Sequence, residues 1–180
     1  PGGPREEPLE RVSARAAAAK RAIGRRAAAQ LTSGMSVALD VGSTTLAVAH
    51  ALVDRAERGE LDGLVVVTNG LTIALALEPA VPRITVVLTG GTLRPLQHSL
   101  VDPGASESFA GLHVDLAILG CNGIDEEGRI TNLNLAEAQV KRAMLAASAA
   151  RLVVADSAKL GARHLGRIGV AGPTTTVVTA

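Results

Sequence analysis

The stretch that decides the fold runs from Val37 to Thr45 and reads Val-Ala-Leu-Asp-Val-Gly-Ser-Thr-Thr. Its apolar first residues are typical of a buried strand, and apolar residues recur at helical spacing after the turn. A strand that enters a helix through Gly-Ser-Thr-Thr brings backbone N–H groups, hydroxyl groups and the positive end of the helix dipole together. The turn therefore suits a phosphate or another small anion. Taken alone, it also fits a simpler role, in which Ser43 or Thr44 caps the helix.

The same alternation of strand and helix patterns continues along the chain. Further buried strands are expected at 64–67, 84–88, 114–119 and 152–155, and further β-prone runs at 168–170 and 174–179. Helices are expected at 9–34, 71–78, 103–109 and 135–149, with Lys20 on the solvated side of the first. This alternation predicts an α/β domain over residues 9–180, with residues 1–8 as a flexible linker. We expect a mostly parallel, Rossmann-like sheet with helices on both faces, plus a smaller β-containing C-terminal part.

Polar residues and glycines follow one expected strand after another. Ligands of open parallel sheets bind beyond the carboxyl ends of the strands, so these residues predict a small-molecule site. The candidates are Asp40, Gly42, Ser43, Thr44, Thr45, Thr68, Asn69, Gly90, Gly91, Arg94, Gly120, Asn122, Gly123, Asp156 and Lys159. Glu137 and Lys141 are spaced for a surface ion pair on a helix, unless that face turns toward the site. Asp125 fits either a general base or an exposed turn.

Composition and missing motifs exclude several classes of protein. The chain has 180 residues, 47% of them hydrophobic, and a formal net charge of +1, which argues against a surface dominated by nucleic-acid binding. A lone cysteine, Cys121, excludes an intrachain disulfide and fits a reducing compartment, where it would be a small apolar filler. The histidines lack ligand spacing, and neither a dinucleotide-binding nor an NTPase glycine motif is present. We therefore expect a cytoplasmic domain without metal, cofactor or membrane association.

The ordered series of motifs resembles the C-terminal sensor domain of DeoR-family transcriptional repressors, from about Glu10 to the tail. Each motif is weak, whereas the set, in this order and spacing, is specific. The motifs are Lys20…Ile23, 40–45, Thr68-Asn69, Gly90-Gly91…Arg94, Asp115…Gly120…Gly123-Ile124, Lys141…Met144 and 156–159. Ala158 stands where the family usually has a second serine.

The resemblance implies a sensor that binds a phosphorylated sugar or related metabolite and self-associates. DNA would be bound only by a winged helix-turn-helix that precedes Pro1, and effector binding would relieve repression. Ser43, Thr44, Thr45 and Lys20 would hold the phosphate. Asp40, Asn69, Arg94, Asn122, Lys141 and Lys159 would contact the sugar or close the site.

The sequence is also similar to ribose-5-phosphate isomerase A, whose phosphate-binding positions match Lys20, Gly42, Ser43 and Thr44. The enzyme's Asp-Gly-Ala-Asp-Glu motif appears here as 122–126 with an amide, Asn122, in place of the first carboxylate. Its Lys-Gly-Gly-Gly segment is not recognisable in 132–134. Binding without turnover is therefore expected. An isomerase-like enzyme with Asp125 or Glu137 as the base, and a pure oligomerisation module, are the alternatives.

Overall fold

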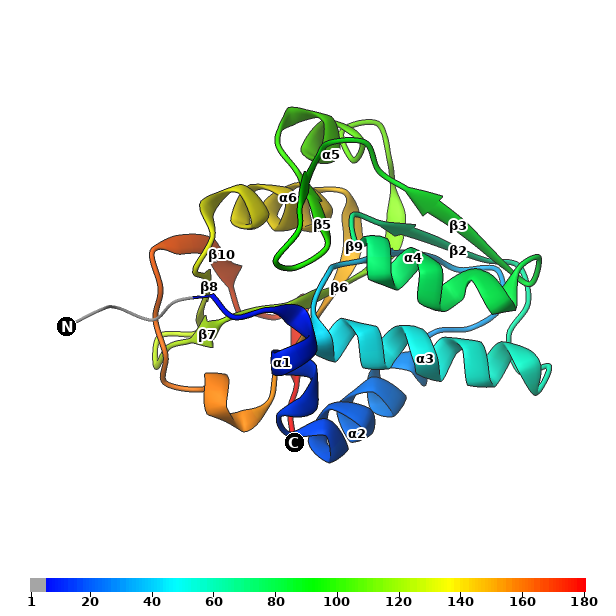
Figure 1. Cartoon of the computed structure of the whole chain (residues 1–180), viewed down its shortest axis with the longest axis horizontal. Helices are drawn as coiled ribbons and strands as arrows, with labels where there is room; N and C mark the ends of the chain where they lie inside the picture. Colours follow the sequence, from blue (N-terminus) through cyan, green and yellow to red (C-terminus); the bar gives the residue numbers. More distant parts are fainter. Residues whose placement is uncertain (1–5) are drawn as a thin grey trace.

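A six-stranded parallel sheet forms the centre of the computed structural model, which describes residues 6–180 (Figure 1). Its strand order is β11-β9-β6-β1-β2-β3, and every neighbouring pair is parallel. The strands are β1 (Ser36–Leu39), β2 (Leu64–Thr68), β3 (Ile84–Leu88), β6 (Val114–Gly120), β9 (Ser148–Val154) and β11 (Thr175–Val178). The chain adds strands outward from β1 to β3 and then returns to the other side of β1 as β6. The carboxyl ends of β1 and β6 therefore flank the point where the strand order reverses, which is where open α/β sheets bind ligands.

Helices cover both faces of this sheet, as the sequence predicts. One face carries α1 (Leu9–Ala14), α2 (Ala17–Ala28), α3 (Ser43–Glu57) and α4 (Leu71–Leu77), the last followed by a 3₁₀ turn (Glu78–Ala80). The other face carries α5 (Pro103–Glu107) and α6 (Leu135–Ala146). Strand side chains alternate between the two cores, since Val37 and Leu39 pack on the first face and Ala38 on the second. No helix in residues 6–180 has both the length and the apolar character needed to cross a membrane.

Two small antiparallel sheets complete the domain. One pairs β4 (Thr92–Arg94) with β5 (Ser99–Val101), and the other has the order β10-β8-β7, from β7 (Gly123–Ile124), β8 (Arg129–Asn132) and β10 (Gly166–Val170). Only the run at 168–170 is anticipated by the sequence, because the other strands are too short to show a pattern. The run at 174–179 becomes β11 and joins the edge of the main sheet.

The predicted single helix over residues 9–34 is wrong. It is two helices, because Arg15 is extended and Ala16 is left-handed, with φ 49° and ψ 35°. Lys20 is also not solvated, since its side chain turns back across this break and its residue is only 4% exposed. After the break, α2 lies in backbone contact with α3. A Cβ on Gly24 would lie 2.5 Å from the carbonyl oxygen of Ala47, so this close approach requires glycine.

Candidate functional site

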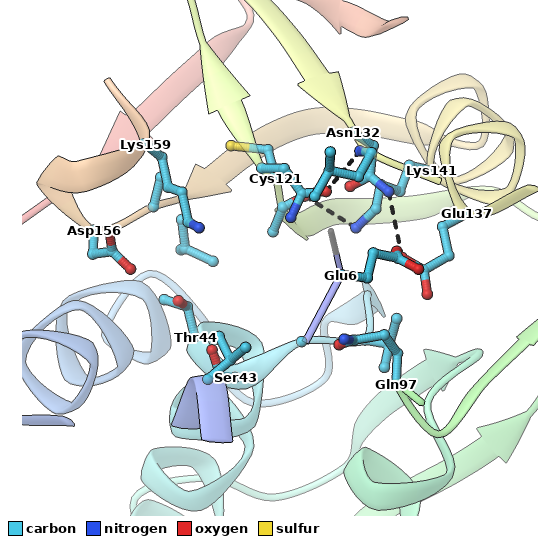
Figure 2. A pocket seen from close by; sticks show the side chains of 18 of the residues that line it. Glu6, Ser43, Thr44, Gln97, Cys121, Asn132, Glu137, Lys141, Asp156 and Lys159 are labelled. Carbon is cyan, nitrogen blue, oxygen red and sulfur yellow. Dashed lines mark hydrogen bonds between the residues drawn. The ribbon is translucent and has the colours of Figure 1, made fainter. Parts of the chain in front are cut away.

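A cavity of about 150 Å³ lies beyond the carboxyl ends of β1, β6 and β9 (Figure 2). Its wall combines the start of α3, the segments after β6, β8 and β9, the inner face of α6, the chain ahead of α2, and the β4–β5 loop. The residues that line it are Glu6, Glu7, Val12, Val41, Gly42, Ser43, Thr44, Gln97, Gly120, Cys121, Asn122, Asn132, Leu133, Glu137, Lys141, Val154, Ala155, Asp156 and Lys159.

The first turn of α3 forms one side of this cavity. The helix begins at Ser43, so its N-cap is Gly42, whose φ of 144° lies in the region that favours glycine. The alternative in which Ser43 or Thr44 caps the helix is therefore wrong, and no side chain among the described residues caps α3. Thr45 donates its hydroxyl to the Gly42 carbonyl at 3.0 Å, whereas Ser43 and Thr44 line the cavity. The first N–H groups of a helix have no partner within it, so this turn can donate to an anion.

A buried ion pair lies behind the cavity and joins β1 to α6. The ammonium of Lys141 contacts Oδ2 of Asp40, whose residue is fully buried, and also donates to the Gly120 carbonyl at 3.1 Å. The Gly120 N–H donates to the same carboxylate oxygen at 3.0 Å. Burial raises the pKa of Asp40 above its usual value, although Lys141 opposes that shift. The positive charge of Lys141 is thus largely neutralised by the carboxylate of Asp40.

Glu137 has its own partners, one turn earlier on α6. Its Oε1 accepts from Arg94 and, at 2.8 Å, from the Ser99 hydroxyl, while Nδ2 of Asn132 lies 3.4 Å from Oε2. The expected surface pair between Glu137 and Lys141 is therefore wrong. Both side chains are buried because this face of α6 turns toward the cavity, and each pairs with a different element.

The segment after β9 brings a second lysine to the cavity. Asp156 precedes a short 3₁₀ turn (Ser157–Lys159), and Lys159 is its last residue. Figure 2 shows both on the same side of the cavity as Ser43 and Thr44. Lys20 lies just behind this wall. Its ammonium donates to the Val12 carbonyl at 2.5 Å, and burial lowers its pKa while the charge of Asp156 opposes that shift.

Comparison with known proteins identifies the family. The family model for the DeoR C-terminal sensor domain matches residues 15–180. The chain belongs to this family. The sensor domain is 37% identical over 145 residues to the HTH-type transcriptional regulator GlpR of Haloferax volcanii, covering 80% of this chain and 53% of that protein. It is 30% identical over 150 residues to the glycerol-3-phosphate regulon repressor of Escherichia coli K12, covering 83% and 57%. The resemblance inferred from the motifs is confirmed.

The sensor domain thus spans a little over half of the length of these relatives. Among solved structures, it is similar to ribose 5-phosphate isomerase A from Methanocaldococcus jannaschii, with a TM-score of 0.57 and 16% identity. That match covers 78% of this chain and 53% of the enzyme. It confirms the predicted fold.

The structure brings only part of the predicted site of the sensor domain into the cavity wall. The predicted residues in the wall are Gly42, Ser43, Thr44, Gly120, Asn122, Lys141, Asp156 and Lys159. Those outside it are Lys20, Asp40, Thr45, Thr68, Asn69, Gly90, Gly91, Arg94 and Gly123. The residues after β2 and β3 lie outside because these strands are on the far side of β1 from β6. There Thr68 accepts from the Gly70 N–H, Asn69 donates to Leu100, and Gly91 packs on α5.

Asp125, which fitted two roles, is a turn residue. Its Oδ1 accepts from the N–H groups of Glu127 and Arg129, and its Oδ2 pairs with Nε of Arg129 at 2.7 Å. The hydrogen bond from Arg129 holds the pKa of Asp125 below its usual value. Asp125 therefore closes the turn between β7 and β8 and does not line the cavity.

Several wall residues were not predicted from the sequence. Asn132 ends β8, a strand too short to recognise, and Leu133 follows it. Gln97 lies in the equally short β4–β5 hairpin. Glu6 and Glu7 belong to the predicted linker, of which residues 1–5 lie outside the described structure. Cys121, expected as an apolar filler, also lines the wall, where burial raises its pKa to about 11.

Proposed function

We propose that this chain is the effector-sensing domain of a transcriptional repressor and that it binds a phosphorylated sugar or a related metabolite without converting it. The first turn of α3 carries this proposal. It presents the glycine N-cap, the free N–H groups and the Ser43 and Thr44 hydroxyls to the cavity, with Lys159 on the same side. Such a helix terminus favours a phosphate through both hydrogen bonds and the helix dipole.

The opposite side of the cavity suits the hydroxyl groups of a sugar. Its charged groups, Glu137 and Lys141, are already paired with Arg94 and Asp40. The side chains of Asn122 and Asn132 add amide donors and acceptors there. Neutralised charges and amides can read a hydroxyl pattern, and we propose that the phosphate binds at the start of α3.

The positions of Asp125 and Glu137, the two residues suggested as the base of an isomerase, support binding rather than isomerisation. A general base must have a lone pair within reach of the proton that it removes. Asp125 is outside the cavity wall, and the carboxylate of Glu137 accepts from Arg94, Ser99 and Asn132. An isomerase-like activity therefore remains only the second candidate, favoured by the fold alone.

The names of the relatives support a role in transcription. Both are regulators, one described as HTH-type and one as a repressor. We propose that DNA is bound by a further part of the protein, outside this chain, and that the sensor domain acts in the cytoplasm as a homo-oligomer. An effector would then switch DNA binding only by binding two arrangements of the subunits with different affinity.

The test is differential scanning calorimetry with paired compounds, each phosphorylated metabolite against its unphosphorylated parent. Glycerol 3-phosphate with glycerol and ribose 5-phosphate with ribose would begin the panel. At least one phosphorylated compound should raise the melting temperature, and its parent should not. Ser43→Ala should weaken binding about 10- to 150-fold, since a hydrogen bond to a charged group contributes about 1.5–3 kcal/mol.

Ser106→Ala is the matched control, because Ser106 lies on α5 and its hydroxyl bonds only to nearby carbonyls. It should leave the shift unchanged. If no phosphorylated compound stabilises the domain, the oligomerisation module is favoured instead. Turnover of an aldose phosphate at about 1 per second or faster would favour the enzyme.

A further inference from the structure

The chain ahead of α2 covers part of the cavity. This N-terminal segment, residues 6–15, contributes Glu6, Glu7 and Val12 to the wall. It is attached to the loop after β4, because the Leu9 N–H donates to the Leu96 carbonyl at 3.1 Å and Gln97 donates to the Glu7 carbonyl at 2.6 Å. Figure 2 shows Glu6 between the Gln97 side and the Glu137 side of the cavity.

Two basic side chains beside the cavity are bound to this segment. Arg94 pairs with Glu6, with Nη2 and Oε2 2.5 Å apart, and these two side chains are only 18% and 19% exposed. Lys20 donates to the Val12 carbonyl, the last turn of α1, also at 2.5 Å. Arg94 and Lys20 are thus both held by residues 6–12.

We propose that Glu6 is an internal competitor of the effector, and that an anionic effector displaces it from Arg94 and releases the N-terminal segment. The inference rests on the proposed function, since it concerns the same cavity. The carboxylate of Glu6 lines the cavity, so a phosphorylated compound brings a second negative charge close to it. Arg94 also pairs with Glu137 and therefore stays in place when Glu6 leaves.

The backbone allows this release without unfolding the domain. The break at Arg15 and Ala16 separates α1 from α2, and α2 remains packed against α3 through Gly24. The buried part of α1 is small, because Leu9 is its one buried residue. Effector binding at α3 is thereby coupled to the position of residues 6–15.

The first test compares the affinity of the wild-type chain, Glu6→Gln and Glu10→Gln for inorganic phosphate and glycerol 3-phosphate. Glu10 is the matched control, because it belongs to the same segment and pairs with His98 of the same loop at 2.9 Å, but lies outside the cavity wall. Glu6→Gln should bind about 1.5- to 5-fold more tightly, the range expected when a partly exposed ion pair no longer competes. Glu10→Gln should match the wild-type chain.

The second test follows amide hydrogen exchange in residues 6–15 during titration with the same two probes. Exchange there should accelerate when the wild-type chain is saturated, while exchange in the first turn of α3 slows. In Glu6→Gln, residues 6–15 should exchange faster even before the probe is added.

The outcomes separate this inference from the proposed function. Tight binding by the wild-type chain with no gain in Glu6→Gln, or slower exchange in residues 6–15 on saturation, overturns the inference and leaves the sensor function standing. Binding by Glu6→Gln alone supports the inference. If neither chain binds either probe or any phosphorylated compound of the panel, both are wrong.

Discussion

The buried pair of Asp40 and Lys141 gives the sharpest prediction about stability. Lys141→Met removes the ammonium but keeps an unbranched side chain only one atom shorter. It leaves the carboxylate of Asp40 fully buried, with only the Gly120 N–H still donating to it. Breaking a buried pair in this way costs about 3–5 kcal/mol. At roughly 2–4 °C per kcal/mol for a domain of this size, the melting temperature should fall by about 6–20 °C.

The loss should depend on pH in a defined direction. The pKa of Asp40 is already raised by burial, and removing Lys141 takes away the charge that opposes the shift. The folded variant then binds a proton more readily than the unfolded chain. Its stability therefore rises as the pH falls from about 7 through the raised pKa toward the value of an unfolded Asp. Relative to the wild-type chain, Lys141→Met should recover part of its loss at about pH 5.

Urea denaturation followed by far-UV circular dichroism measures this effect, because the chain has neither tryptophan nor tyrosine as a fluorescent probe. Asp40→Asn combined with Lys141→Met is the control. It removes both charges and keeps an oxygen that can accept from Gly120, so it should be more stable than Lys141→Met alone. The reasoning is refuted if Lys141→Met loses less than about 1 kcal/mol, or if its loss grows as the pH is lowered.

Three further predictions follow from other contacts. Gly24→Val should destabilise the domain by about 1–3 kcal/mol in urea denaturation, because its Cβ would meet the Ala47 carbonyl, and an unchanged midpoint would contradict this packing. Burial raises the pKa of Cys121 to about 11, and only the thiolate reacts with an alkylating agent. Alkylation of Cys121 at about pH 8 should therefore be on the order of 100-fold slower than alkylation of a free thiol, and it should accelerate as the pH rises. Asp125→Asn should speed amide exchange in the β7–β8 turn, where Arg129 loses its ion pair with Asp125 and keeps the one with Glu127. It should leave affinity for phosphorylated compounds within about twofold of wild type. A larger loss of affinity would place Asp125 in the site.

The main sheet follows from local sequence patterns. β1, β2 and β6 are mostly apolar runs with mostly buried residues, and the edge strand β3 is an apolar run in which only Ile84 is buried. These four runs were recognisable without any long-range information. The helix break before α2 could not be recognised from the sequence, because residues 9–29 are rich in alanine and favour one continuous helix. The left-handed Ala16 depends on tertiary contacts, among them the hydrogen bond from Lys20 to Val12.

The sequence predicted the part of the site that lies directly after β1, β6 and β9. The residues after β1, β6 and β9 line the cavity, whereas Thr68 and Gly91, which carry the same kind of signal, lie outside it. A motif after a strand does not reveal that strand's place in the sheet. The sequence alone therefore could not distinguish the residues that line the cavity from those that lie outside it. Glu6 could not be found either, because its role depends on the folding of residues 6–15 across a distant loop.

The central claim is that the first turn of α3 holds a phosphate group. A titration of the ¹⁵N-labelled chain with glycerol 3-phosphate and with glycerol tests it most directly, by following the backbone amides of Ser43, Thr44 and Thr45. The account predicts large, saturable downfield shifts of these amides with a phosphorylated compound and none with its parent. If these three amides do not move while a phosphorylated compound binds and shifts amides elsewhere, the phosphate site is not at α3 and the account is wrong.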